Sequence, residues 1–190
     1  MDIFSHGLWA GAGALALKKK IGLKINPWVA GWWGLFPDLF AFTIPTLWIL
    51  SGVLTGTLDR NAFPDPHAAE PAPPDGLPML QLASMLYNWS HSLVIFALVF
   101  GIVWFVLRRP VWELGGWLLH ILADIPTHSY QFFPTPVFWP LFTWKFDGFS
   151  WGTPWFLIPD YILLAVVFYL LLRKRKQAVR ADSISRGGML

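Results

Sequence analysis

The chain has 190 residues, of which 55% are hydrophobic and only 13% are charged, and its mean hydropathy is +0.50. A soluble domain carries about 25% charged residues, so water is not the main solvent of this protein. The absence of cysteine excludes disulfides and thiolate metal sites, and the net charge of +3 sits beside apolar runs, where it indicates membrane topology and not nucleic-acid binding.

The hydrophobic pattern predicts an all-α bundle with about five membrane segments, since a span needs about 20 apolar residues and fewer where neighbours bury it. Asp2 precedes the first apolar run and three lysines follow it, which predicts an uncleaved helix and not a signal peptide. One membrane-embedded domain then covers residues 1–172. The predicted segments are residues 3–17, 28–54, 89–107, 111–125 and 154–172.

The basic residues predict how the bundle is oriented. Twelve of the fourteen Lys and Arg residues fall within residues 18–24, 108–109 and 173–186. With five spans all three groups share one side, which the positive-inside rule makes cytoplasmic. The N-terminus is therefore expected outside, and residues 173–190 are expected to form a basic, disordered cytoplasmic tail.

Two outer loops are predicted, at about residues 55–87 and 126–153. The first is acidic and rich in proline, places His67 in solvent, and ends in a short amphipathic helix at residues 77–87 on the outer interface. The second is rich in Phe, Pro and Trp, which indicates a lid or a re-entrant segment with aromatic membrane anchors.

Ionisable side chains inside membrane segments are costly, so each one is a candidate functional residue. Counted at about 1.5 Å per residue from the nearest basic residue, six of them lie roughly 17 to 26 Å deep, in one slab towards the outer side. They come from all five segments and are His6, Asp38, His91, His120, Asp124 and Asp160.

The sharpest local signal is the stretch from His120 to His128. His120 and Asp124 are four residues apart and share a helix face, a spacing that lets two side chains hold one ion. Pro126 is expected to loosen or end the helix and to leave His128 at the helix end. Taken alone, His120 and Asp124 are explained equally well by hydrogen bonds to neighbouring helices. The ionisable groups at matching depth on the other segments favour a metal site.

Four further polar side chains are expected to support a ligand or contact the substrate: Ser90, Ser92, Asp147 and Asp160. Asn88 is predicted to cap the helix that carries His91, and a helix N-terminus favours anions and neutral imidazole. An ordinary cap with an interfacial histidine explains this motif nearly as well, and Asp147 beside Gly148 is also typical of a turn.

Several motifs together resemble the YdjM-like family of bacterial inner-membrane metal-dependent hydrolases. The resemblance spans roughly residues 1–160 and implies a bacterial cytoplasmic (inner) membrane location, a membrane-embedded metal site and hydrolytic activity. Residues 39–41 are Leu-Phe-Ala where some members carry further Asp and His, which favours one metal ion over two. The motifs are Ser5-His6-Gly7, Phe36-Pro37-Asp38, Ser90-His91-Ser92 and the block from His120 to Pro140.

The predicted function is a metal-dependent hydrolase that cleaves a membrane lipid or a lipid-linked (phospho)ester and opens to the outer leaflet. Zn²⁺ is the preferred ion, and His128 is the expected general acid or base, with Asp124 beside it. The predicted metal ligands are His6, Asp38, His91, His120 and Asp124.

Two other classes of function remain open at this stage. A metal-ion or proton transporter uses the same kind of buried His/Asp layer, although the spans on the inner side are nearly all apolar. A non-catalytic membrane protein with a structural metal also fits the motifs. Metal flux across sealed vesicles and the effect of His128→Ala distinguish the three.

Overall fold

The computed structural model describes residues 1–59 and 78–187, with side chains described as far as Arg173. Over this range the protein is all-helical, as predicted, with six α-helices and one 3-10 turn. The predicted acidic loop falls mainly on residues 60–77, outside the described residues. The elements are α1 (Ile3–Ile21), α2 (Pro27–Leu54), α3 (Pro78–Ser90), α4 (Leu93–Leu107), η2 (Trp112–Leu114), α5 (Gly115–Thr127) and α6 (Pro154–Gly187).

Local sequence sets where the first two helices begin. The Asp2 side chain accepts hydrogen bonds from the backbone nitrogens of Phe4 and Ser5, which caps α1. The Asn26 side chain caps α2 in the same way, and Pro27 fills the first helical position, where no backbone donor is needed. These two caps fix the helices that carry two of the predicted site residues.

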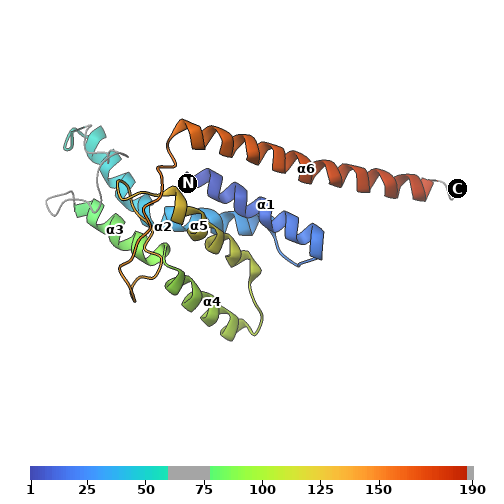
Figure 1. Cartoon of the computed structure of the whole chain (residues 1–190), viewed down its shortest axis with the longest axis horizontal. Coiled ribbons are helices and arrows are strands. Elements are labelled where there is room, and N and C mark those ends of the chain that lie inside the picture. Colours follow the sequence, from blue (N-terminus) through green and yellow to red (C-terminus); the bar gives the residue numbers. More distant parts are fainter. Residues whose placement is uncertain (60–77, 188–190) are drawn as a thin grey trace.

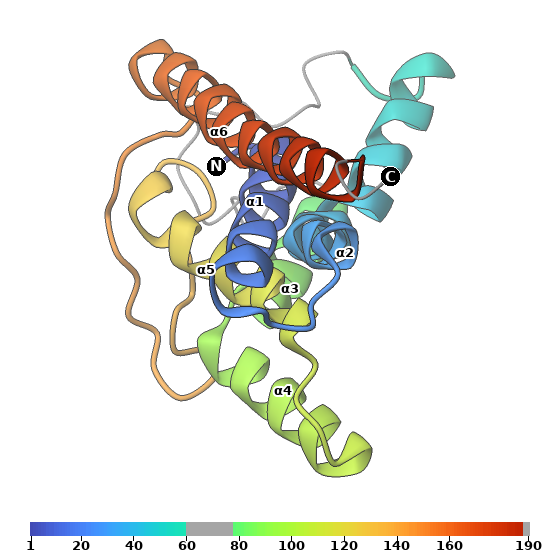
Figure 2. The same ribbon diagram turned by 90° about the vertical axis from the view of Figure 1, so that its right-hand side faces the viewer.

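Three helices pack closely enough to bring their side chains together. Helix α1 packs along α2 and α5, and Figures 1 and 2 show α2, α5 and α6 around α1. Small residues permit this approach: a Cβ on Gly34 of α2 would lie 2.8 Å from the His6 carbonyl oxygen, and one on Gly116 of α5 would collide with the Ala30 carbonyl. Close packing is therefore a condition for the site described below.

Two helices, α2 and the apolar part of α6 (Pro154–Arg173), are long and apolar enough to cross a membrane. Helices α3 and α4 meet the same test only as a pair, bent by 56° at the break between them. Of the other predicted segments, α1 has 19 residues but ends in three lysines, and α5 has 13 residues. The described residues thus contain two or three candidate spans, and the five-span topology stays a prediction.

The structure differs from the predicted elements in two places. The segment predicted at residues 89–107 is broken at residues 91–92, and Asn88 does not cap it: Asn88 lies inside α3, and Ser92 caps α4. Ser92 also donates a hydrogen bond to the Trp139 carbonyl at 2.5 Å, a contact between distant parts of the chain. Helix α6 continues to Gly187, past the end expected at residue 172 (Figure 1), through a sequence rich in Arg, Lys and Ala, which favour helix.

Candidate metal centre

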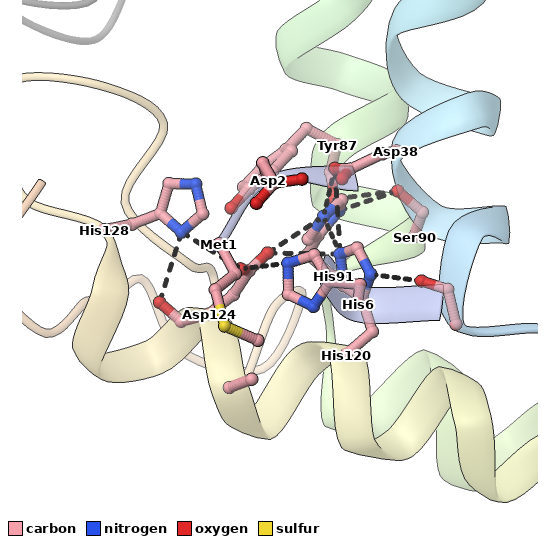
Figure 3. A network of polar contacts seen from close by, with 12 residues as sticks. Met1, Asp2, His6, Asp38, Tyr87, Ser90, His91, His120, Asp124 and His128 are labelled. Carbon is pink, nitrogen blue, oxygen red and sulfur yellow. Dashed lines mark hydrogen bonds and ion pairs between the residues drawn. The ribbon is translucent and has the colours of Figure 1, made fainter. Parts of the chain in front are cut away.

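Five ionisable side chains from separate parts of the chain meet inside the helix bundle (Figure 3). His6 lies on α1, Asp38 on α2 and His91 in the break between α3 and α4, while His120 and Asp124 lie one turn apart on α5. Four of them are fully buried and Asp38 is partly buried. Because they come from different helices, tertiary packing assembles this cluster.

Four of these side chains form a candidate metal site, with one ligand atom each and all four atoms within 4.8 Å of one another. His91 Nε2 lies 3.0 Å from His120 Nε2, and Asp38 Oδ1 lies 3.4 and 3.7 Å from these two nitrogens. Asp124 Oδ2 lies 3.5 Å from His91 Nε2 and 3.1 Å from His120 Nε2. A tetrahedral ion with bonds of about 2.0 Å separates its ligand atoms by about 3.3 Å, so this donor set fits a small divalent cation.

Hydrogen bonds on the outer side of both imidazoles leave the inner nitrogens as lone pairs. His120 Nδ1 lies 2.7 Å from the Gly34 carbonyl oxygen, which can only accept, so Nδ1 carries the hydrogen. His91 Nδ1 lies 2.9 Å from Ser90 Oγ, which itself donates to a backbone carbonyl, and 3.3 Å from the Tyr87 carbonyl oxygen. In the neutral imidazoles two Nε2 lone pairs then face each other at 3.0 Å, an arrangement that a cation stabilises.

The Asp124 carboxylate places its two oxygens in different surroundings. Oδ1 lies 2.7 Å from the Met1 nitrogen, 2.8 Å from His6 Nε2 and 3.3 Å from His128 Nδ1. Oδ2 faces the imidazole pair and has no hydrogen-bond partner among the residues that the structure describes. A buried oxygen without a partner costs about 1–3 kcal/mol, more when it is charged, and a bound cation would offset that cost.

His6 belongs to the cluster but lies outside the four-residue group. Its ring stacks on His120 with the centroids 3.7 Å apart. It is buried, and within the described part of the chain neither ring nitrogen has a hydrogen-bond partner, although Nε2 lies 2.8 Å from Asp124 Oδ1. Native proteins rarely leave such a buried group unpaired, so His6 is a fifth candidate ligand.

His128 ends α5 and lines the cavity beside the cluster. Its Nδ1 lies 3.3 Å from both the carbonyl oxygen and Oδ1 of Asp124. The loop that follows α5 holds its backbone, since Gly148 N donates to the His128 carbonyl at 2.9 Å. His128 is therefore held beside the four-residue group and is not one of its members (Figure 3).

The structure separates the four residues expected to support a ligand or contact the substrate. Only Ser90 touches the cluster, through His91 Nδ1. Ser92 caps α4, and Asp147 accepts a hydrogen bond from the Tyr130 backbone nitrogen at 2.9 Å in the loop between α5 and α6. Asp160 accepts from Ser5 Oγ and, at 2.8 Å, from Trp9 Nε1, so it fastens α6 to α1.

Replacing Asp160 is expected to weaken the fold without removing a metal. Asp160→Ala removes the carboxylate acceptor of the buried Ser5 hydroxyl and of the partly buried Trp9 indole, at a cost of roughly 1–3 kcal/mol for the hydroxyl and less for the indole. We expect a melting temperature lower by several degrees in detergent and unchanged metal content. The matched control is Tyr161→Phe, which removes an exposed hydroxyl bound to Asp2 and should change little. Metal loss from folded Asp160→Ala protein would contradict this role.

Two contributors to the cluster, a backbone carbonyl and an aromatic ring, were not predicted from the sequence. The Gly34 carbonyl orients His120, and the Tyr87 ring stacks on His91 with centroids 3.6 Å apart. Pro37 does not point to the Gly34 carbonyl directly, because the carbonyl that its missing backbone N–H leaves without a helical donor is that of Trp33, one residue earlier. The stacking of Tyr87 on His91 has no signal in the sequence, because it depends on where α3 ends.

Comparison with models of known protein families, with curated proteins and with solved structures found no match. The fold and the site define the class directly: a helical protein with two or three candidate membrane spans and a buried His/Asp cluster that can hold a metal ion.

Proposed function

We propose that this protein is a membrane-embedded metal-dependent hydrolase whose substrate is a lipid or a lipid-linked (phospho)ester. The observation that carries the proposal is the contact between the candidate metal site and an apolar cavity. Asp38 belongs to both, and His128 lines the cavity while its Nδ1 lies 3.3 Å from Asp124 Oδ1. A purely structural ion would have no need of such an opening.

The exposure of the four ligands supports a site that substrate can reach. Structural zinc sites are closed by four protein ligands, whereas catalytic sites keep a position for water or substrate. The side chains of His91, His120 and Asp124 are 0% exposed, but Asp38 is 15% exposed and makes the longest of the four His–Asp approaches, 3.7 Å to His120. We infer that the open position lies on the Asp38 side.

The chain's own residues would divide the chemistry between them. Asp38, His91, His120 and Asp124 would hold the ion, with His6 as a further candidate. A bound Zn²⁺ or similar ion would lower the pKa of a water molecule to about 7 and polarise the substrate. His128 would move a proton on the cavity side, because its imidazole lines the cavity and lies beside Asp124.

The membrane setting and the family resemblance belong to the same proposal. Five segments with the N-terminus outside would place the cluster towards the outer side of a bacterial cytoplasmic membrane, where the basic residues mark the inner side. The resemblance to the YdjM-like hydrolases supports both the location and the reaction class. Helix α1 and the short α5 would then cross the membrane surrounded by the other helices, which allows a span with fewer apolar residues.

Packing on the other side of the cluster favours hydrolysis over transport. A transporter needs polar access to its site from both faces of the membrane. Trp117, one turn before His120 on α5, is 4% exposed and belongs to an apolar core with Ile95, Phe96, Leu114 and Ile121. This apolar core supports a dead-end site.

The proposal is tested on full-length protein purified in detergent without added metal. Metal analysis should find a stoichiometric divalent ion, and a screen of lipid esters and phosphoesters should reveal hydrolysis that a chelator removes. Protein that neither carries nor binds a divalent ion would exclude the metal site. Metal flux into sealed vesicles without hydrolysis would assign the site to transport.

A further inference from the structure

A cavity of about 620 Å³ lies between α1, α2, α3 and the loop after α5. Its walls are mainly apolar side chains, and its ionisable residues include Asp38 and His128, which touch the cluster. Pockets of this volume accommodate small molecules. The composition of the walls, however, favours a hydrocarbon over a polar substrate.

The cavity is long in one direction. Along α2 its lining runs from Asp38 to Ile49, which is roughly 16 Å at a rise of about 1.5 Å per residue. The polar end is the end next to the candidate metal site, and the far end is set by Ile49, which is 2% exposed. A molecule with a polar head and one extended apolar tail therefore fits a cavity with one polar end and a long apolar wall.

The rim of the cavity is apolar too. Phe4 of α1 and Leu47 of α2 line the cavity and are 70% and 59% exposed. Exposed apolar side chains are stable where hydrocarbon and not water surrounds a membrane protein. A tail could therefore pass from the bilayer into the cavity without crossing water.

We infer that this cavity binds a single aliphatic chain of a membrane lipid, with the head beside Asp38 and His128 and the chain end at Ile49. The inference rests on the proposed function. It identifies the part of the proposed substrate that is bound but not cleaved. Ala83 of α3, a small side chain that is 1% exposed and lines the cavity, leaves the room for the chain. Ile49 and Ala83 then determine how long a chain is accepted.

A chain-length series tests this assignment on the full-length protein in nanodiscs. The probes are single-chain alkylphosphocholines of increasing length, measured by displacement of a fluorescent fatty acid. Affinity should rise roughly fourfold per added methylene, the factor that follows from burying one methylene group, and then level off when the chain reaches Ile49. Ile49→Ala should move this plateau to longer chains, and Ala83→Met should move it to shorter ones.

The matched control is Ile95→Ala, the same truncation in the apolar core that does not line the cavity. It should leave the plateau where it is in the unaltered protein. A plateau common to all variants, or affinity that does not depend on chain length, would overturn the inference. If one cavity variant fails to fold, the other still moves the plateau in its own direction.

The same series in Asp124→Asn protein separates this inference from the proposed function. A plateau that Ile49→Ala still shifts in this background shows that the cavity binds the chain whether or not a metal is held. Metal binding and hydrolysis with no dependence on chain length would support the proposed function and overturn the chain assignment.

Discussion

Asp124→Asn is expected to remove the divalent ion from protein purified in detergent. The substitution keeps the shape of the side chain but removes the negative charge that faces both imidazole nitrogens, 3.1 and 3.5 Å away. Losing a direct ligand should weaken metal binding by more than the roughly 100-fold that accompanies loss of an outer hydrogen-bond partner. His120→Ala should have the same effect, because it removes one of the two facing nitrogens.

Metal content by mass spectrometry and melting temperature with and without chelator measure this effect. An ion present at about 100 times its dissociation constant stabilises a fold by about 2.7 kcal/mol, and each kcal/mol corresponds to roughly 2–4 °C for a chain of this size. Chelation should therefore lower the melting temperature of the unaltered protein and leave that of Asp124→Asn unchanged.

The control is the same substitution at a carboxylate outside the cluster. Asp147→Asn changes a side chain that accepts a hydrogen bond from the Tyr130 backbone nitrogen in the loop between α5 and α6, so the metal should remain. Equal metal content in Asp124→Asn and in the unaltered protein would mean that the cluster is only a hydrogen-bonded network of buried side chains.

The meeting of Asp38, His91, His120 and Asp124 could be foreseen because helices rise by a constant amount per residue. If the basic residues are taken as one boundary of the bundle, counting from them places groups on different helices at one height. Height does not say in which direction a side chain points. Asp160 shows this limit, since it has a similar predicted depth but faces Ser5 and Trp9.

The break before α4 could not be foreseen from the local sequence. Asn88 and Ser92 are both good capping residues, and the sequence alone does not rank them. In the structure Ser92 is the cap, and its hydroxyl also donates to the Trp139 carbonyl. In addition, Trp117 Nε1 donates to the Ser90 carbonyl at 2.6 Å. These contacts link residues 27 and 47 positions apart, so tertiary structure decides where the chain breaks and where His91 points.

His128→Ala is expected to separate catalysis from metal binding. His128 lies outside the four-residue group and lines the cavity, so its removal should leave the ion in place. A positioned general acid or base contributes about 10²–10⁴-fold to a reaction, so kcat for the lipid substrate should fall by about that factor. Metal analysis and hydrolysis assays on the same preparation measure both quantities.

Two further measurements distinguish proton transfer from a structural effect of the substitution. Exogenous imidazole should restore part of the activity of His128→Ala, since it can occupy the space that the side chain leaves and carry the proton. His128→Gln, which keeps a polar side chain of similar size but cannot exchange a proton, should stay as inactive as His128→Ala before rescue. Hydrolysis that continues at the full rate in His128→Ala would remove His128 from the reaction and move the proton transfer to Asp38, the member of the candidate metal site that lines the cavity.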